Sequence, residues 1–233
     1  NPYSSLTKAS NGKFYGMTYN GGANNYGVIY EVGYMGPYIN KVDFTSASNG
    51  AYPYGALCMA NDGKMYGLTR QGGTNGYGCF FSYVPGTGTI TVLRNFSNPD
   101  GIFPMGTLIQ ATDNKLYGLT SSGGTNGYGT IFSYDIGTTT FTVLHSFNAP
   151  SDGGAPKGSL IQASNGKLYG LTNSGGSGAA GTIFEYNIGL VQYTVLQALN
   201  SGSTGSGAEG DLTETSPGTL FALARSEERR VGK

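Results

Sequence analysis

The side chains that could act as acids, bases or nucleophiles are few. His145 is the single histidine, so a Ser–His–Asp triad would need it, yet no serine or carboxylate stands in a distinctive motif around it. Corresponding positions elsewhere in the chain hold Arg94 and Gln197, which indicates an exposed position on a strand. We therefore expect no catalytic residue.

The carboxylates do not form a convincing acid–base pair for glycosidic cleavage either. Glu31 and Glu185 stand in strand-like runs where other copies of the same pattern have Ser82 and Ser133, so we expect both glutamates to face outward. The remaining candidates stand beside Gly or Asn, where Asp stabilises a turn: Asp62, Asp100, Asp113 and Asp152.

Metal and cofactor sites are also unsupported. Cys58 and Cys79 align with apolar or β-branched residues, so we expect free, buried thiols, and two cysteines cannot complete a zinc site of four ligands. The loops around Asp100 and Asp152 offer oxygen ligands but contain no calcium-binding pattern. The Gly-Gly doublets precede strands and lack the Gly-Lys-Ser/Thr of a phosphate loop, so no cofactor is expected.

Aromatic and amide side chains in glycine-rich loops are the best candidates for binding. Such residues stack on sugars or grip a peptide, and loops on a rigid scaffold commonly carry function. The alternative is that each tyrosine folds over its own loop. The fourth copy of the loop, at 177–180, has lost the tyrosine. The candidate ligand-binding residues are Asn25, Tyr26, Asn75, Tyr77, Asn126 and Tyr128.

These loops belong to a tandem repeat with a period near fifty residues. A Tyr-Gly pair begins at positions 15, 66, 117 and 169, spaced 51, 51 and 52 residues apart, and Phe221 continues the series. Such a period indicates a stacked or radial array. We predict one repeat domain over residues 1–224, with copies at about 6–56, 57–107, 108–159 and 160–211 and a partial copy at 212–224.

Each copy reads as four short strands. In the third copy they span 108–111, 115–120, 130–134 and 140–147. The first two strands are joined at Asp113-Asn114, where other copies have Asn-Gly or Asp-Gly, which predicts a type I′ turn. The sequence therefore predicts an all-β fold, a β-propeller-like array of four-stranded antiparallel blades with about 51 residues per repeat, forming an incomplete ring. A stacked β-solenoid is the alternative.

The repeated Tyr-Gly pair is interpreted as a packing device. Glycine inside a strand weakens it unless another group must approach closely. We expect each glycine to make room for an aromatic ring of the neighbouring blade. The tyrosines then fill the space between blades, with their hydroxyls bonded to a partner.

Composition narrows the function classes. The chain has 41 glycines in 233 residues, 11% charged residues and a net charge of zero, with no basic stripe for nucleic acid. No apolar run approaches a membrane span. Residues 225–233 break this composition and resemble a translated sequencing adapter, so we expect a non-native tail.

The spaced elements of residues 115–147 and 167–196, Lys-Leu-Tyr-Gly-Leu-Thr followed by Gly-Gly, Gly-Thr-Ile-Phe and Thr-Val-Leu, resemble the bacterial GloVer (Gloeo–Verruco) tandem repeat. The blade period also resembles that of kelch repeats. The GloVer resemblance implies secreted or surface-exposed bacterial proteins and no established enzymatic activity. The first copy departs from the pattern, because 36–39 replaces the usual turn and fourth strand.

The resulting hypothesis is a non-catalytic, extracellular or cell-surface module that binds carbohydrate, protein or matrix through its blade loops. One alternative is part of an extracellular polysaccharide-active enzyme, whose catalytic residues would lie at non-repeated positions or elsewhere. A second alternative is a passive structural spacer.

Overall fold

The chain folds into successive antiparallel sheets, which we call blades 1 to 4. The computed structural model describes residues 4–200, 207–208 and 210–221. Blade 1 contains β1 (Thr7–Lys8), β2 (Phe14–Thr18), β3 (Val28–Val32) and β4 (Tyr38–Asp43). Blade 2 contains β5 (Cys58–Met59), β6 (Met65–Thr69), β7 (Cys79–Val84) and β8 (Thr89–Asn95).

The later copies repeat this order. Blade 3 contains β9 (Ile109–Gln110), β10 (Leu116–Thr120), β11 (Thr130–Asp135) and β12 (Thr140–Ser146). Blade 4 contains β13 (Ile161–Gln162), β14 (Leu168–Leu171), β15 (Ala179–Asn187) and β16 (Gln192–Asn200). A hairpin of β17 (Thr213–Ser216) and β18 (Thr219–Phe221) follows. The predicted tail at 225–233 lies outside the described residues.

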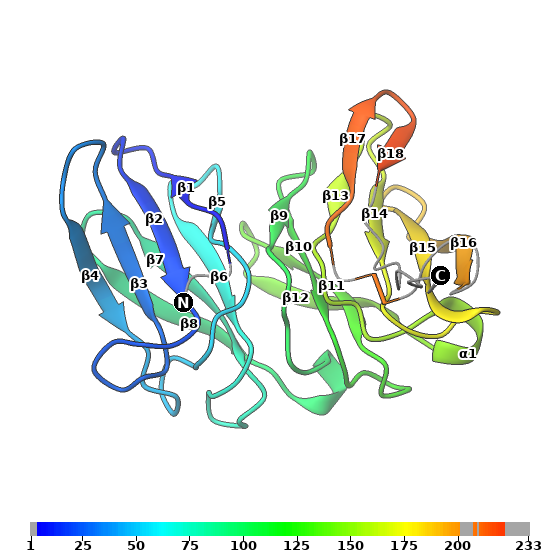
Figure 1. Cartoon of the computed structure of the whole chain (residues 1–233), viewed down its shortest axis with the longest axis horizontal. Helices are drawn as coiled ribbons and strands as arrows, with labels where there is room; N and C mark the ends of the chain where they lie inside the picture. The colour runs from blue at the N-terminus through cyan, green and yellow to red at the C-terminus, as the bar shows by residue number, and fades with distance from the viewer. Residues whose placement is uncertain (1–3, 201–206, 209, 222–233) are drawn as a thin grey trace, which may run out of the picture.

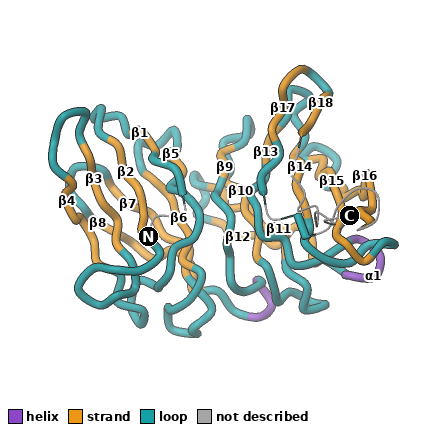
Figure 2. The backbone as a smooth tube through the Cα atoms, viewed as in Figure 1, coloured by secondary structure: helices purple, strands orange, loops and turns teal. Residues whose placement is uncertain are grey.

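The blades follow one another from left to right in Figure 1, and the first strand of each lies innermost. β1 contacts β5 and β5 contacts β9, and residues before all the first strands line one common pocket. The molecule is all-β and propeller-like, and the described strands do not form a closed sheet. Figure 2 shows that both short helices, at Asn98–Asp100 and α1 (Ala149–Asp152), lie in crossover segments at the lower edge.

The turns between first and second strands differ from the predicted type. The Gly12 N–H donates to the Ala9 carbonyl and the Ala9 N–H to the Lys13 carbonyl. Gly12 has φ 79°, whereas Asn11 is not in the positive-φ region, so the type I′ prediction is wrong. The geometry is a type I turn followed by one left-handed residue, which Asn114 adopts in blade 3 with φ 65°.

Blade 1 keeps its fourth strand despite the altered sequence at 36–39. β4 pairs with β3 from Tyr38 opposite Val32 to Asp43 opposite Val28, with an irregularity between Ile29 and Tyr30. The same irregularity recurs in the other blades, between Ile131 and Phe132 in blade 3. Backbone pairing therefore tolerates the replacement.

Apolar cores lie between consecutive blades. Tyr15 of blade 1 is fully buried against Met65, Phe81 and Tyr83 of blade 2, and the Tyr15 and Tyr83 rings are 5.6 Å apart. Tyr66 and Tyr117 occupy the same place in the next two cores. The predicted packing role of these tyrosines is confirmed.

The glycine beside each tyrosine makes room for a different ring than expected. A Cβ on Gly118 would lie 2.5 Å from Cζ of Phe132, and a Cβ on Gly67 would lie 2.4 Å from Cζ of Phe81. Both phenylalanines belong to the glycine's own blade, so the prediction of a neighbouring blade's ring is wrong. The reason is register: Gly118 pairs directly with Phe132 across β10 and β11, and the ring folds back over it.

Candidate binding face

One end of the molecule, which we call the loop face, carries two kinds of segment. The loops between second and third strands span 19–27, 70–78 and 121–129, and the crossovers between blades span 46–54, 97–105 and 148–157. The amides predicted as ligands have structural contacts here. Asn75 Nδ2 donates to the Phe96 carbonyl at 3.0 Å, and Asn126 Nδ2 to the Ser146 carbonyl at 3.4 Å. These bonds tie each loop to the end of its own fourth strand.

Asn25 does not take the same place. Asn24 makes the corresponding bond, to the Phe44 carbonyl at 3.1 Å, so Asn24 is the true counterpart of Asn75. Asn25 has φ 58° and accepts from the Gly21 N–H at 3.0 Å. Asn25 therefore stands where blade 2 has Gly76, φ 78°.

The loop tyrosines pack on the crossover that follows their blade rather than on their own loop. Tyr26 meets Tyr52 edge to face at 5.6 Å, and Tyr77 meets Phe103 at 5.7 Å. Tyr128 lies over Gly154, where an added Cβ would be 3.0 Å from the Tyr128 Cβ. Tyr77 and Tyr128 remain 39% and 42% exposed, whereas Tyr26 is half-buried.

The crossover residues under these tyrosines have an uncommon backbone. Tyr52, Phe103 and Ala155 have φ of 57°, 56° and 50°. Their N–H groups donate to the carbonyls of Tyr26, Tyr77 and Tyr128 at 2.9, 3.1 and 2.9 Å. Left-handed conformations in non-glycine residues cost about 1–2 kcal/mol each. The hydrogen bonds to the loop tyrosines help to hold these three crossover residues in that conformation.

Four partly buried tyrosines gather where blades 1 and 2 meet; we call Tyr19, Tyr26, Tyr52 and Tyr54 the tyrosine cluster. Tyr19 lies 5.1 Å from Tyr52 and 6.2 Å from Tyr54, ring to ring. Arg70 Nη1 donates to the Tyr19 hydroxyl at 3.5 Å. Arg70 Nε is buried and has no hydrogen-bond partner in the described part of the chain.

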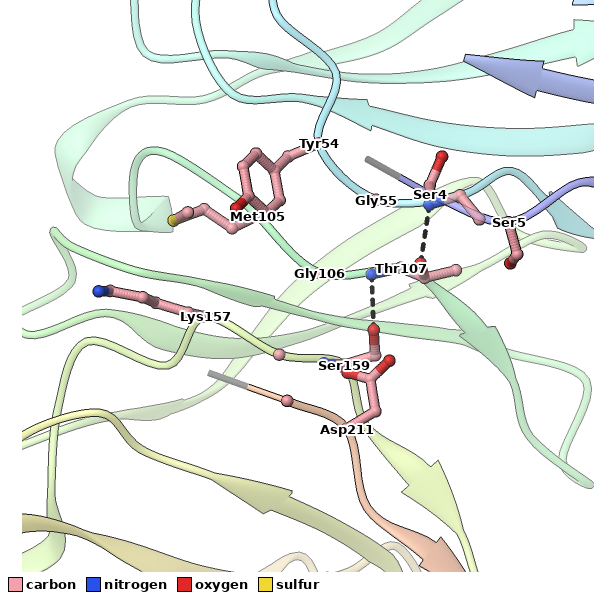
Figure 3. Close-up of a pocket in the computed structure, with 13 residues that line it drawn as sticks. Ser4, Ser5, Tyr54, Gly55, Met105, Gly106, Thr107, Lys157, Ser159 and Asp211 are labelled. Atoms are coloured by element: carbon pink, nitrogen blue, oxygen red, sulfur yellow. Dashed lines mark hydrogen bonds between the residues drawn. The ribbon is translucent and has the colours of Figure 1, made fainter. Parts of the chain in front are cut away.

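A pocket of about 220 Å³, which we call the axial pocket, opens where the blades converge. Tyr54, Met105 and Lys157 occupy the same position in successive repeats, and Figure 3 shows their side chains extending to one side of the inner segments. Together with Arg70 these residues were missed by the sequence comparison, because no copy repeats their side chains.

A belt of hydrogen bonds from blade to blade supports this pocket. The Ala56 N–H donates to Thr107 Oγ1 at 2.8 Å, and the Thr107 N–H to Ser159 Oγ at 2.9 Å (Figure 3). The Ser159 N–H donates to Asp211 Oδ1 at 2.6 Å. The inner segments approach closely at glycines, since a Cβ on Gly106 would lie 2.2 Å from the Gly158 carbonyl oxygen. The support is thus repeated even though the lining residues vary.

His145 has a structural partner. Its Nε2 lies 2.8 Å from Asp152 Oδ2, and its ring stacks on Tyr193 at 4.0 Å. The side chain is 22% exposed, so the expected exposed position is wrong, and burial lowers its pKa. In blade 2, Arg94 makes the corresponding paired contact with Asp100, at 3.0 and 2.5 Å. These pairs join a fourth strand to the following crossover.

Glu31 and Glu185 face inward, which overturns the expected outward orientation. Glu31 is 2% exposed, accepts from the Tyr15 hydroxyl at 2.7 Å and pairs with Lys13. The bond from Lys13, followed by that from Tyr15, lowers the pKa of Glu31. Glu185 accepts from Tyr169 at 2.8 Å and is half-buried. Both glutamates are occupied as hydrogen-bond acceptors.

The cysteines are unpaired in the structure. Cys58 and Cys79 are free, as predicted, but only Cys79 is buried, whereas Cys58 is half-buried. Desolvation raises the pKa of each thiol to about 11. Within the described residues, no group of three or more His, Cys, Asp or Glu is placed to hold a metal ion. Over the same residues, no helix is long and apolar enough to span a membrane.

The consecutive four-stranded blades and their shared axial pocket define a propeller-like repeat protein. The sequence matches the Gloeobacter/Verrucomicrobia repeat over residues 1–109 and again over 56–230. The chain belongs to this family, which confirms the resemblance noted from the sequence, and the overlapping matches agree with tandem repetition.

Solved structures support the same fold. TolB from Acinetobacter baumannii is 16% identical with a TM-score of 0.55, over 87% of this chain and 44% of that one. A Nidogen/Laminin complex is 14% identical with a TM-score of 0.63, and the match covers 96% of this chain and 72% of that one. The extracellular domain of the one-component system BT4673 from B. thetaiotaomicron is 13% identical with a TM-score of 0.59. That match covers 90% of this chain and 24% of that one. The chain spans less than half of the TolB structure, and no curated protein matches it.

Proposed function

We propose that the chain is a non-catalytic binding module, secreted or displayed at the cell surface, that holds a carbohydrate, protein or matrix partner on its loop face. The observation that carries this proposal is a contrast between positions. The second strand repeats Tyr-Gly in every blade, whereas the loop-face position of Tyr54 holds Met105 and Lys157 in the next two. A repeated scaffold with a varied face is the arrangement expected of a repeat protein that binds a partner.

The chemistry of the face suits binding. Tyr77 and Tyr128 are among the exposed large side chains, and their backbones are fixed by hydrogen bonds to the crossovers. Rigid tyrosines supply a large contact area with a polar tip and lose little entropy on binding. The groups that could catalyse, such as His145 and Glu31, are instead engaged in structural pairs.

The location outside the cell is supported by the family resemblance and by a structural neighbour. The similar BT4673 domain is described as extracellular. The neutral charge of the chain also gives no reason to expect a nucleic acid partner.

The test is binding to a glycan array and to a panel of extracellular matrix proteins. A Tyr77→Ala/Tyr128→Ala variant is expected to lose the signal of the unmodified chain. Tyr34→Ala is the matched control, because Tyr34 is 87% exposed at the opposite end of blade 1. Binding that is unaffected by the double substitution would place the partner elsewhere. Turnover of a polysaccharide panel would contradict a non-catalytic role.

A further inference from the structure

We infer that the axial pocket and the tyrosine cluster form one continuous site for an acidic oligosaccharide. This inference rests on the proposed function and names one ligand class and a second place on the loop face, where binding depends on Tyr54 and Arg70 and not on Tyr77 and Tyr128.

The axial pocket and the tyrosine cluster adjoin each other at Tyr54. Tyr54 lines the axial pocket and also packs edge to face on Tyr19 at 6.2 Å. Tyr19 lies against Tyr52 at 5.1 Å, and Tyr52 contacts Tyr26 at 5.6 Å. A surface of four partly exposed aromatic rings therefore runs outward from the pocket. Such a surface accepts the apolar faces of successive sugar rings, while the phenol groups offer hydrogen bonds.

The axial pocket is small. The axial pocket measures about 220 Å³ and adjoins a hollow of about 600 Å³, with which it shares Ser5, Ala56, Thr107, Ser159 and Asp211. The pocket itself is smaller than the roughly 300–1,000 Å³ of pockets that enclose a drug-sized ligand. It suits one ring-sized unit, held against Tyr54 and Met105. Further units would lie outside the pocket on the tyrosine cluster. The dimensions thus favour a short oligomer over a single small molecule.

A cationic side chain adjoins the tyrosine cluster. Arg70 reaches the tyrosine cluster through its 3.5 Å bond to Tyr19, and its buried Nε has no partner among the described residues. The Arg70 side chain is half-buried, and a guanidinium fork is the group that best matches a carboxylate. Lys157 adds a second cation at the pocket. Asp211 also lines the pocket and keeps its negative charge while it accepts the Ser159 N–H, so it offsets Lys157, and the net positive charge of the site comes from Arg70.

The site occurs once in the described chain. The residues that correspond to Arg70 in blades 1 and 3 are Tyr19 and Ser121, and the counterparts of Tyr54 are Met105 and Lys157. The combination of arginine and clustered tyrosines therefore belongs to the junction of blades 1 and 2 alone. One ligand per chain is expected.

Isothermal titration calorimetry of the chain with trigalacturonic acid, and with the neutral trigalactose of equal length, tests the charge argument. We expect the acidic trimer to bind more tightly, with one site per chain. Arg70→Gln is expected to weaken the acidic trimer about tenfold or more and to leave the neutral one unchanged. Lys64→Gln, a cation exposed at the opposite end of blade 2, is the matched control and is expected to change neither.

Two further variants test the place. Tyr54→Ala is expected to weaken both trimers, with Tyr34→Ala as its control. Met105→Trp fills the axial pocket without touching the cores between blades and is expected to abolish binding. With two independent variants, the test remains decisive even if one of them fails to fold. Near-ultraviolet circular dichroism checks each fold.

Equal binding of the two trimers, or no binding of the acidic one by the folded chain, overturns the inference. So does binding that survives Arg70→Gln and Met105→Trp. If a glycan or protein binds and depends on Tyr77 and Tyr128 but not on Arg70, the proposed function stands and this inference fails.

Discussion

Blades 1 and 3 satisfy the buried hydroxyl of their second-strand tyrosine in different ways. In blade 1, Tyr15 donates to Glu31 on the third strand at 2.7 Å. In blade 3, Tyr117 donates to Asp113 in the preceding turn at 2.7 Å. Blade 4 has the same arrangement as blade 1, with Tyr169 donating to Glu185. Blade 2 has the same arrangement as blade 3, with Tyr66 donating to Asp62.

The turn residue changes together with the third strand. Where the strand supplies Glu31, the turn supplies Asn11, whose Nδ2 donates to the Tyr15 hydroxyl at 2.9 Å. Where the turn supplies Asp113, the third strand has Ser133 opposite Tyr117. Each blade therefore keeps one carboxylate for its tyrosine, and either of two positions can provide it. Fixed geometry, rather than a fixed residue, is what the repeat preserves.

The largest effect is expected from removing the ring that both arrangements share. Tyr117→Ala should lower the free energy of unfolding by about 3–5 kcal/mol, because the ring fills the core between blades 3 and 4. Tyr169→Ala should behave similarly, since the arrangement of the acceptor is secondary to ring burial. Chemical denaturation measures both. Tyr128→Ala, at a 42% exposed ring, is the control, and an equal loss there would contradict the packing role.

The second prediction converts one arrangement into the other. Asp113→Asn should cost about 1–3 kcal/mol, since the buried Tyr117 hydroxyl loses its carboxylate. Ser133→Glu should restore most of this loss in the double variant, because Ser133 faces Tyr117 as Glu31 faces Tyr15. Lys115 stands where Lys13 pairs with Glu31.

A double-mutant cycle measured by denaturation quantifies this exchange. Ser133→Glu alone should be destabilising, because it brings a second carboxylate beside Asp113. If the changes in the free energy of unfolding caused by the two substitutions are additive, the two positions are not interchangeable sources of the carboxylate.

Much of the fold could be predicted from the sequence because the repeat period and the alternating apolar residues report it directly. The role of Tyr15 followed from its recurrence. The burial of Glu31 did not, because each repeated position was judged alone. The exchange between positions 11 and 31 is visible only when the two are compared as a pair across copies.

The candidate site was less predictable. Tyr77 and Tyr128 stand out in their loops, but the axial pocket joins Tyr54, Met105 and Lys157, which are about one repeat apart in sequence. Convergence of the first strands depends on how the blades stack, which residue patterns within one blade do not specify. The left-handed backbone of Tyr52 is similarly set by its neighbours rather than by its type.

The carboxylates that accept from Tyr15 and Tyr66, Glu31 and Asp62, differ in burial. Tyr15→Phe should destabilise the chain more than Tyr66→Phe, by about 1 kcal/mol. The Glu31 side chain is 3% exposed and loses a buried donor, whereas the Asp62 side chain is 25% exposed and regains water. Thermal unfolding of the two variants measures the difference. Equal losses would mean that burial of the acceptor does not distinguish the blades.

The smallest effect is expected in the response to acid. The Lys13 and Tyr15 bonds hold the pKa of Glu31 below its usual range. For Glu185, burial opposes the shift, but the bonds from Lys167 and Tyr169 still lower its pKa. A carboxylate with a lowered pKa in the folded state stabilises that state above its ordinary pKa of about 4.3, and the benefit is lost as pH falls through the folded-state value.

A Glu31→Gln/Glu185→Gln variant should therefore be less stable than the unmodified chain at pH 7, and the gap should narrow as the pH falls below about 4.3. Denaturation curves at a series of pH values measure it. Glu214, whose pKa is lowered by backbone bonds from Gly218 and Ser164, is present in both proteins and cancels in the difference. A gap that stays constant with pH would show that these glutamates act only as neutral packing groups, and blades 1 and 4 would then no longer differ electrostatically from blades 2 and 3.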